Sequence, residues 1–188
     1  MLTLLAVAVQ FISGLSKPNF NPVNFFGFFT ILSNTFGAIV LLYASSAMKL
    51  PSRNIDLLRG AAVLCLTIVG LVFSILLANL ESDIIPWVNV VVHYITPAAI
   101  VFDWLIDPPQ TTLRIRDAFW WLALPLAYVC YTLFRGSIVH WYPYPFLNVD
   151  NNGYFSVLTY IAGICVFSLV VAFLVIAVGN ALRAKKLQ

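Results

Sequence analysis

The sequence has very few charged side chains. Lysine, arginine, aspartate and glutamate together make up 9% of its 188 residues, whereas 62% of the residues are hydrophobic. About a quarter of the residues of a soluble globular domain are charged, because they cover a water-facing surface. The composition therefore excludes a soluble domain, a disordered chain and a nucleic-acid-binding protein. It predicts an integral membrane protein whose surroundings are membrane lipids.

Acidic and metal-binding side chains are also scarce, and this limits the chemistry. Glu81 is the only glutamate, and His93 and His140 are the only histidines. A hydrolase site built on two glutamates is excluded, and the HExxH zinc motif is absent. The three cysteines form no CxxC pair and lie inside apolar runs, so we expect buried, inert thiols. The sequence predicts neither a metal nor a cofactor.

Long apolar runs separated by short polar breaks predict an all-α, polytopic membrane protein made of one domain, residues 1–188. A helix needs about 20 residues to cross the hydrocarbon core. The first run is shorter, but it lacks the basic segment of a signal peptide, so we interpret it as a span. The six predicted spans cover residues 2–15, 25–48, 57–80, 85–106, 118–138 and 154–182.

The basic residues predict the orientation of these spans. With six crossings both termini lie on one side of the membrane, and most of the basic residues fall on that side. They are Lys49, Arg53, Arg59, Arg114, Arg116, Arg183, Lys185 and Lys186. Only Lys17 and Arg135 fall on the other side. The positive-inside rule therefore places both termini in the cytoplasm. The expected location is a cell membrane of the bacterial inner-membrane type. The loop 139–153 then faces outside, and we interpret its aromatic residues as an interfacial belt.

Two of the predicted spans carry polar side chains in their outer halves. Thr30, Ser33 and Asn34 lie in span 25–48, and Asn89 and His93 lie in span 85–106. Residues four apart share a helix face. At 1.5 Å per residue, Thr30 lies about 8 Å and His93 about 12 Å from the outer ends of their spans. Because polar groups inside a membrane are costly and mark functional sites, we expect these two stripes to face each other.

Pro97 modifies the second stripe. It follows His93 by four residues and has no N–H to donate to the His93 carbonyl. We therefore expect the helix to open and kink at His93. Such an opened backbone is tolerated in a membrane only where it faces protein or a wet cavity.

These side chains suggest nucleophilic catalysis. A threonine hydroxyl becomes a nucleophile when a neighbouring base removes its proton, and histidine is the commonest such base. Thr30 and His93 are therefore the candidate catalytic pair, Asn34 and Asn89 candidate donors to an oxyanion, and Ser33 a candidate substrate contact. The alternative is structural, because serine and threonine often bond their own helix backbone and asparagine often joins membrane helices.

Two charged residues near the ends of spans are interpreted separately. Asp103 lies near the predicted cytoplasmic end, where Arg59 or the pair Arg114 and Arg116 can neutralise it. Arg135 lies at the outer end of its span, where a long basic side chain normally extends to the interface. Arg135 is also a candidate ligand for a lipid carboxylate or phosphate.

Three short motifs resemble the androgen-induced-protein family, which includes the androgen-dependent TFPI-regulating proteins and small bacterial relatives. The motifs are Phe28–Thr30, Pro86–Asn89 followed by His93, and Gly136 followed by Trp141 and Tyr144–Leu147. The resemblance implies a multispan threonine hydrolase that cleaves lipid esters, especially fatty acid esters of hydroxy fatty acids. It also implies that Thr30 is the nucleophile and His93 the catalytic histidine. The chain departs from the animal members at Leu32, where they carry aspartate, and at Pro97, which they place one residue later.

The leading hypothesis is thus a membrane lipid esterase whose partner is a lipid ester or fatty-acid substrate. Two alternatives remain open. A lipid-binding or transport protein needs the same polar pocket in the outer leaflet but no reactive contact between Thr30 and His93. A structural or assembly subunit needs the polar residues only to join helices.

Overall fold

The computed structural model describes residues 1–47, 52–80, 83–186 and 188, and every regular element in these ranges is helical. The predicted all-α class is therefore confirmed. The elements are α1 (Leu2–Leu15), α2 (Pro22–Phe25), α3 (Phe29–Ala47), α4 (Arg53–Val72), η1 (Phe73–Leu77), α5 (Pro86–Val90), η2 (Val91–Ile95), α6 (Thr96–Ile106), α7 (Ile115–Val139), η3 (Pro145–Leu147) and α8 (Val149–Lys186).

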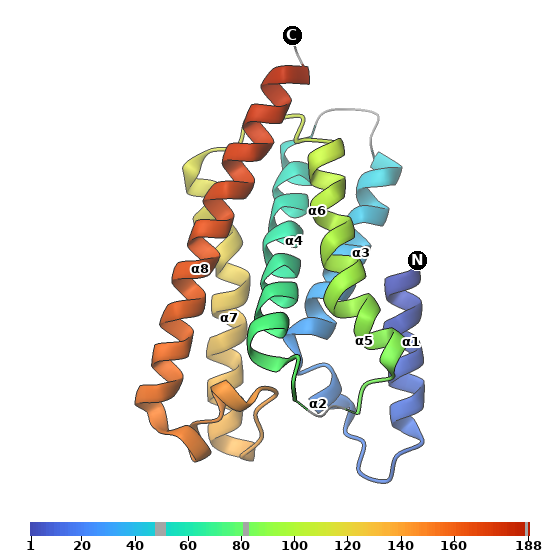
Figure 1. Ribbon diagram of the computed structural model, residues 1–188, viewed down its shortest axis with the longest axis vertical. Coiled ribbons are helices and arrows are strands. Elements are labelled where there is room, and N and C mark those ends of the chain that lie inside the picture. The colour runs from blue at the N-terminus through green and yellow to red at the C-terminus, as the bar shows by residue number, and fades with distance from the viewer. Residues whose placement is uncertain (48–51, 81–82, 187) are drawn as a thin grey trace.

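The helices form a bundle around α4, which packs against α3, α6, α7 and α8 (Figure 1). Within the described ranges, five helical segments are long and apolar enough to cross a membrane. They are Phe29–Ser46, Arg53–Leu77, Pro86–Ile106, Ile115–Val139 and Val149–Lys186. Helix α1 is apolar but covers only about 21 Å at 1.5 Å per residue, and it packs against α3 and η2 at the side of the bundle opposite α8.

The two ends of the bundle differ in composition. The basic end is where α4 and α7 begin and where α6 and α8 end, and it contains Arg53, Arg59, Arg114, Arg116, Arg183 and Lys186. The aromatic end contains the loop 140–148 between α7 and α8. Figure 1 shows the C-terminus at the basic end and the N-terminus part of the way along the bundle. Lys49, which the orientation argument also uses, and Glu81 lie outside the described residues.

The outer surface of the bundle is apolar. Phe155, Trp120 and Phe134 are 89%, 74% and 70% exposed, respectively. Such an exterior suits the hydrocarbon of a membrane, because water would penalise a continuous exposed apolar surface. Cys65 is buried as expected, whereas Cys130 is exposed on this exterior, so the expectation that all three thiols are buried was wrong for Cys130.

Close packing at the centre of the bundle depends on glycine. A Cβ atom placed on Gly60 of α4 would overlap the Trp121 ring of α7. A Cβ atom on Gly179 of α8 would lie 2.9 Å from the Trp104 ring of α6. Each glycine therefore accepts an indole that no larger residue could accommodate without displacing the helix.

Several predicted span boundaries were wrong. The span predicted as 25–48 begins at Phe29, and residue 48 lies outside the described ranges. The segment before it forms the separate helix α2. Asn21 caps the start of α2 by accepting hydrogen bonds from the N–H groups of Val23 and Asn24. The helix ends at Phe25, two residues before Gly27. Hydropathy alone merged the two helices into one run.

Three other spans begin earlier than predicted. The spans predicted as 57–80, 118–138 and 154–182 are found at Arg53–Leu77, Ile115–Val139 and Val149–Lys186, the last with non-helical backbone at Gly153 (φ 71°). The hydropathy pattern assigns the charged residues of these first turns to loops. In the structure, Arg53 pairs with Asp117, and Asp150 pairs with His140. The helix bounds predicted as 2–15 and 85–106 agree with the structure to within one residue, although Leu2–Leu15 is not among the five segments long enough to cross a membrane.

The segment Pro86–Ile106 contains one π-helical turn, η2. In a π turn, each N–H pairs with the carbonyl five residues earlier, and the Thr96 N–H accordingly donates to the Val91 carbonyl. The next carbonyl is that of Val92, and its π partner would be the N–H that Pro97 lacks. The proline therefore opens the backbone at Val92, one residue before the predicted position.

A polar network closes the basic end. Asp56, only 2% exposed, accepts hydrogen bonds from the backbone N–H groups of Gln110 and Thr111 (3.1 and 2.7 Å) and from the Thr111 hydroxyl (2.6 Å). Arg59, also buried, lies 2.7 Å from the Asp103 carboxylate, which confirms the predicted neutralisation of Asp103. The network fixes the loop between α6 and α7 against the first turns of α4.

The network makes Asp56 a determinant of stability. In the variant Asp56→Ala, the backbone N–H groups of the 107–114 loop lose their acceptor inside the protein, so we expect the free energy of unfolding to fall by about 3 kcal/mol. Thermal unfolding in detergent micelles, followed by circular dichroism, measures this loss. Asp150→Ala is the matched control, because that exposed carboxylate pairs with His140 alone among the described residues and should change stability by less than about 1 kcal/mol. Equal losses in the two variants would contradict the assignment.

Candidate active site

Thr30 lies at the start of a helix rather than inside one. It is the second residue of α3, so its backbone N–H has no partner within the helix. This N–H donates to the hydroxyl of Tyr144 at 3.2 Å. The side chain of Thr30 is buried, with 8% of the residue exposed. The break at Gly27 thus places a threonine hydroxyl and an available backbone N–H at the same point.

His93 lies in the π turn η2 and is held by Asn89 one turn earlier. Its Nδ1 lies 2.6 Å from the Asn89 side-chain oxygen Oδ1 and 3.2 Å from the Asn89 backbone carbonyl. A carbonyl oxygen only accepts hydrogen bonds, so Nδ1 carries the proton. In the neutral ring, Nε2 then presents its lone pair, as a general base requires.

The structure brings Thr30 and His93 together. The Thr30 hydroxyl oxygen Oγ1 lies 3.4 Å from His93 Nε2, the same nitrogen that Asn89 leaves unprotonated. His93 is 4% exposed. The contact is long for a hydrogen bond, as is common for catalytic pairs without substrate. A threonine hydroxyl and an imidazole nitrogen therefore face each other inside the bundle.

Asn34 has a different role from the one the sequence suggests. Its amide nitrogen donates to the Thr30 carbonyl at 2.9 Å and to the Val92 carbonyl at 3.0 Å. The Val92 carbonyl is the one that Pro97 leaves without a helix partner. Both amide hydrogens of Asn34 are thus used, and none is available for an oxyanion. Asn34 instead joins α3 to η2 and sets the distance between Thr30 and His93.

The remaining predicted site residues occupy three different positions. Asn89 contacts His93 as an acceptor and orients the imidazole. Ser33 is buried, and no hydrogen bond joins it to Thr30 or His93 in the part of the chain that the structure describes. Arg135 donates to Asn24 and lies 5.0 Å above the Trp141 ring, so it ties α7 to α2 and to the loop 140–148.

Sequence reasoning gave no role to Tyr144, which belongs to the site. Its hydroxyl lies 3.3 Å from Thr30 Oγ1, in addition to accepting the Thr30 N–H. Burial raises the pKa of Tyr144 above its ordinary value, so the phenol stays protonated and can donate. The residue was interpreted as part of an interfacial belt because an aromatic loop residue has no helical register to place it.

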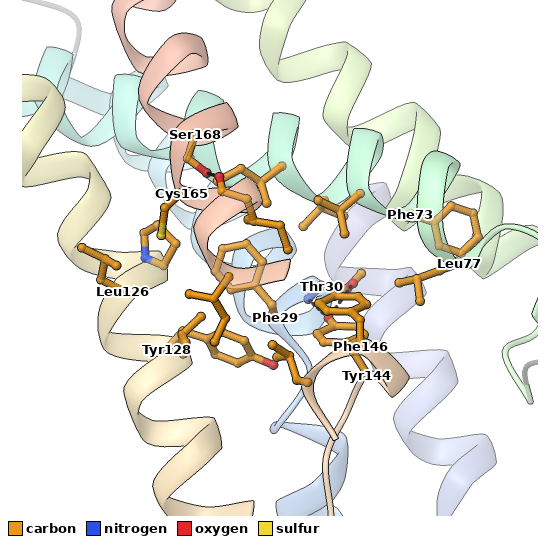
Figure 2. A pocket seen from close by; sticks show the side chains of 18 of the residues that line it. Phe29, Thr30, Phe73, Leu77, Leu126, Tyr128, Tyr144, Phe146, Cys165 and Ser168 are labelled. Carbon is orange, nitrogen blue, oxygen red and sulfur yellow. Dashed lines mark hydrogen bonds between the residues drawn. The ribbon is translucent and has the colours of Figure 1, made fainter. Parts of the chain in front are cut away.

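An apolar slot of about 710 Å³, including its mouth, opens beside Thr30 (Figure 2). Figure 2 shows Thr30, Tyr144 and Phe146 together, with Cys165 and Ser168 on a more distant wall. The lining comes from α3, α4, η1, α7, α8 and the loop 140–148, and none of its residues is charged. It consists of Phe29, Thr30, Ile68, Val69, Val72, Phe73, Leu77, Leu122, Pro125, Leu126, Tyr128, Val129, Tyr144, Phe146, Leu147, Ile161, Ile164, Cys165 and Ser168.

Phe73 separates His93 from this slot. The two rings are stacked, with centroids 3.7 Å apart and planes 13° from parallel. Phe73 begins the π turn η1 and also lines the slot, so η1 and η2 meet at this contact. The imidazole therefore has one face covered, while its Nε2 edge points to Thr30.

The site contains no evident metal-binding set. Across residues 1–47, 52–80, 83–186 and 188, no three histidine, cysteine, aspartate or glutamate side chains gather closely enough to hold a metal ion. The polar groups that the site brings together are hydroxyls, an imidazole and amides.

We compared the chain with protein-family models, with curated proteins and with solved structures, and none of them matches it. The resemblance suggested by the three sequence motifs therefore stays a prediction, and the assignment of function depends on the geometry of the site.

Proposed function

We propose that the chain is an integral membrane esterase that cleaves lipid esters, with Thr30 as nucleophile and His93 as base. One observation carries the proposal. The Thr30 hydroxyl lies 3.4 Å from the unprotonated nitrogen of an imidazole whose other nitrogen is fixed by Asn89. The same threonine lines a slot whose walls are almost entirely apolar.

In the first half of the proposed reaction, Thr30 Oγ1 attacks the ester carbonyl while His93 Nε2 takes its proton. The carbonyl oxygen becomes an oxyanion. When this intermediate collapses, the bond to the alcohol breaks, and the alcohol leaves with the proton from His93. The acyl group remains bound to Thr30 as an ester.

In the second half, water takes the place of the alcohol. His93 removes a proton from the water, and the resulting hydroxide attacks the acyl-Thr30 carbonyl. Collapse of the second tetrahedral intermediate releases the fatty acid and returns the proton to Thr30 Oγ1. Asn89 stabilises the imidazolium through both halves, because its two oxygens accept from Nδ1.

The oxyanion donors in this mechanism are the Thr30 backbone N–H and the Tyr144 hydroxyl. Without substrate these groups bond each other, at 3.2 Å. A substrate carbonyl oxygen would displace this contact and accept from both groups, once the Tyr144 hydroxyl has moved away from the Thr30 N–H. This pair replaces Asn34 and Asn89, the donors suggested by the sequence.

The apolar lining of the slot supports an acyl chain as the part of the substrate that is bound. Each methylene group buried there contributes about 0.8 kcal/mol to binding. Fatty acid esters of hydroxy fatty acids are the substrate class that the family resemblance implies. The alternative of lipid binding without chemistry is less favoured, because binding alone needs no threonine within 3.4 Å of an oriented imidazole.

We also propose six membrane crossings, including the short helix α1, with both termini in the cytoplasm of a bacterial cell. Two observations support this orientation. The basic residues of α4, α7 and α8 gather at one end of the bundle, where Arg53 and Arg183 bond the loop between α6 and α7. Lys17 and Arg135 flank the opposite end. The positive-inside rule then places the active site in the outer leaflet.

Thr30→Ala and His93→Ala test the catalytic pair. We expect each to lower the rate of hydrolysis of a 4-nitrophenyl acyl ester at least about 10³-fold, and the double variant to be no slower than either single variant, because the two groups act as a unit. Labelling by a fluorophosphonate probe should disappear in Thr30→Ala. Ser33→Ala is the control, since that neighbouring hydroxyl has no role in the mechanism. Full activity in a folded Thr30→Ala protein would eliminate the proposal.

Tyr144→Phe tests the oxyanion donor. The substitution keeps the ring and removes only the hydroxyl, so we expect kcat to fall about 10²-fold with little change in KM. Steady-state kinetics with the same ester measure the two constants separately. Tyr142→Phe is the matched control in the same loop and should remain active. A change in KM alone would mean that Tyr144 contributes to binding and not to the transition state.

Single cysteines test the topology in a variant whose three native cysteines are replaced by serine. Asn151→Cys should react with a membrane-impermeant maleimide in intact cells, and Lys185→Cys only after permeabilisation. A peptide tag placed before Met1 should resist external protease in intact cells. If the tag is digested while Lys185→Cys stays protected, the chain crosses the membrane an odd number of times and the six-span proposal is wrong.

A further inference from the structure

A second apolar hollow lies next to the slot. It is a groove of about 1,190 Å³, including its open side, between the end of α4 with η1 and the outer half of α8. Both walls belong to segments long and apolar enough to span a membrane, so the groove faces lipid. Its lining consists of Leu71, Val72, Ile75, Leu76, Phe155, Ser156, Thr159, Tyr160, Gly163, Ile164 and Phe167.

The groove and the slot are adjacent. Val72 and Ile164 line both of them, so these two side chains form the partition. Each is partly exposed rather than buried, and neither has a hydrogen bond or charge that would fix it in place. The partition between the groove and the slot is therefore a single layer of aliphatic side chains.

Aromatic rings line the slot on the side of the loop 140–148. Tyr144 and Phe146 both line it and are stacked, with centroids 5.3 Å apart and planes 3° from parallel. Phe146 also contacts Tyr160 of α8, with ring centroids 5.8 Å apart. An ester that entered past this loop would meet these rings, whereas one that came from the groove would pass Val72 and Ile164.

The groove has room for an alkyl chain. A Cβ atom built on Gly163 of α8 meets nothing within 4 Å, so this glycine borders open space. The hydroxyl of Thr159 donates to the Phe155 carbonyl of its own helix and is therefore satisfied. An apolar chain lying here leaves no polar group of Thr159 without a partner.

We propose that this groove is a lateral portal, through which a long-chain ester passes from the bilayer into the slot and in which one of its alkyl chains lies during the reaction. The inference rests on the proposed esterase function and adds the route by which the substrate enters and the place where one of its alkyl chains lies. The substrate is a long-chain ester dissolved in the membrane rather than a short ester in water.

Gly163→Trp tests the portal, because the indole fills open space in the groove without contacting Thr30 or His93. The assay compares 4-nitrophenyl palmitate in lipid nanodiscs with water-soluble 4-nitrophenyl butyrate. We expect kcat/KM for the palmitate to fall at least about tenfold, the loss that follows when two methylene groups are no longer buried. Hydrolysis of the butyrate and labelling by a short fluorophosphonate should stay unchanged. Leu158→Trp, on another face of α8, is the matched control.

The outcomes separate the two proposals. If the native protein hydrolyses neither ester, the esterase function fails and the portal fails with it. If it hydrolyses both, but Gly163→Trp does not favour butyrate over palmitate, the portal alone is wrong.

Photocrosslinking with the unaltered chain tests the portal without relying on a variant. A palmitoyl ester with a terminal diazirine should label the segment 155–167, and a long-chain fluorophosphonate bound to Thr30 should suppress the labelling. Labelling that is insensitive to the fluorophosphonate would indicate ordinary surface lipid and overturn the portal.

Discussion

The hydrogen bond from Asn34 to the Val92 carbonyl is the contact on which the site depends. It exists because Pro97 supplies no N–H to that carbonyl, and because an unpaired carbonyl inside a membrane must find another donor. The same amide holds the Thr30 carbonyl, so one side chain joins the start of α3 to η2. The backbone hydrogen bond missing at Pro97 thereby helps to fix the separation between a hydroxyl and an imidazole that are 63 residues apart in the sequence.

The charged groups that stabilise the bundle and the polar groups of the candidate site lie toward opposite ends of it. Charged groups at the basic end pair with one another and with the loop between α6 and α7, as Asp56 and Arg59 illustrate. At the other end, the polar groups are uncharged amides, hydroxyls and an imidazole, set among aromatic rings. Ion pairs can hold the frame where water is near, whereas a hydroxyl nucleophile gains from a drier setting, in which electrostatic interactions are stronger.

The sequence predicted the helical class, most of the spans and the facing pair Thr30 and His93, because hydropathy and the 1.5 Å rise together determine depth in a membrane. It did not predict the roles of Asn34 and Asn89, since both amides have donors and acceptors and only the partners decide which are used. Tyr144 could not be placed, because the chain between α7 and α8 has no periodic pattern that would say where a ring docks. The start of α3 was missed because Gly27 breaks an apolar run without interrupting its hydropathy.

The stacking of Phe73 on His93 has a consequence for the order of events in the proposed reaction. One face of the imidazole is covered and its Nδ1 is held by two oxygens, so the ring is kept from rotating to exchange its two nitrogens between steps. Every proton must therefore be gained and lost at a single nitrogen, on the edge that faces Thr30. The departing alcohol and the incoming water use that edge in succession, so the alcohol has to vacate the cavity before deacylation begins, and turnover follows a strict ping-pong sequence.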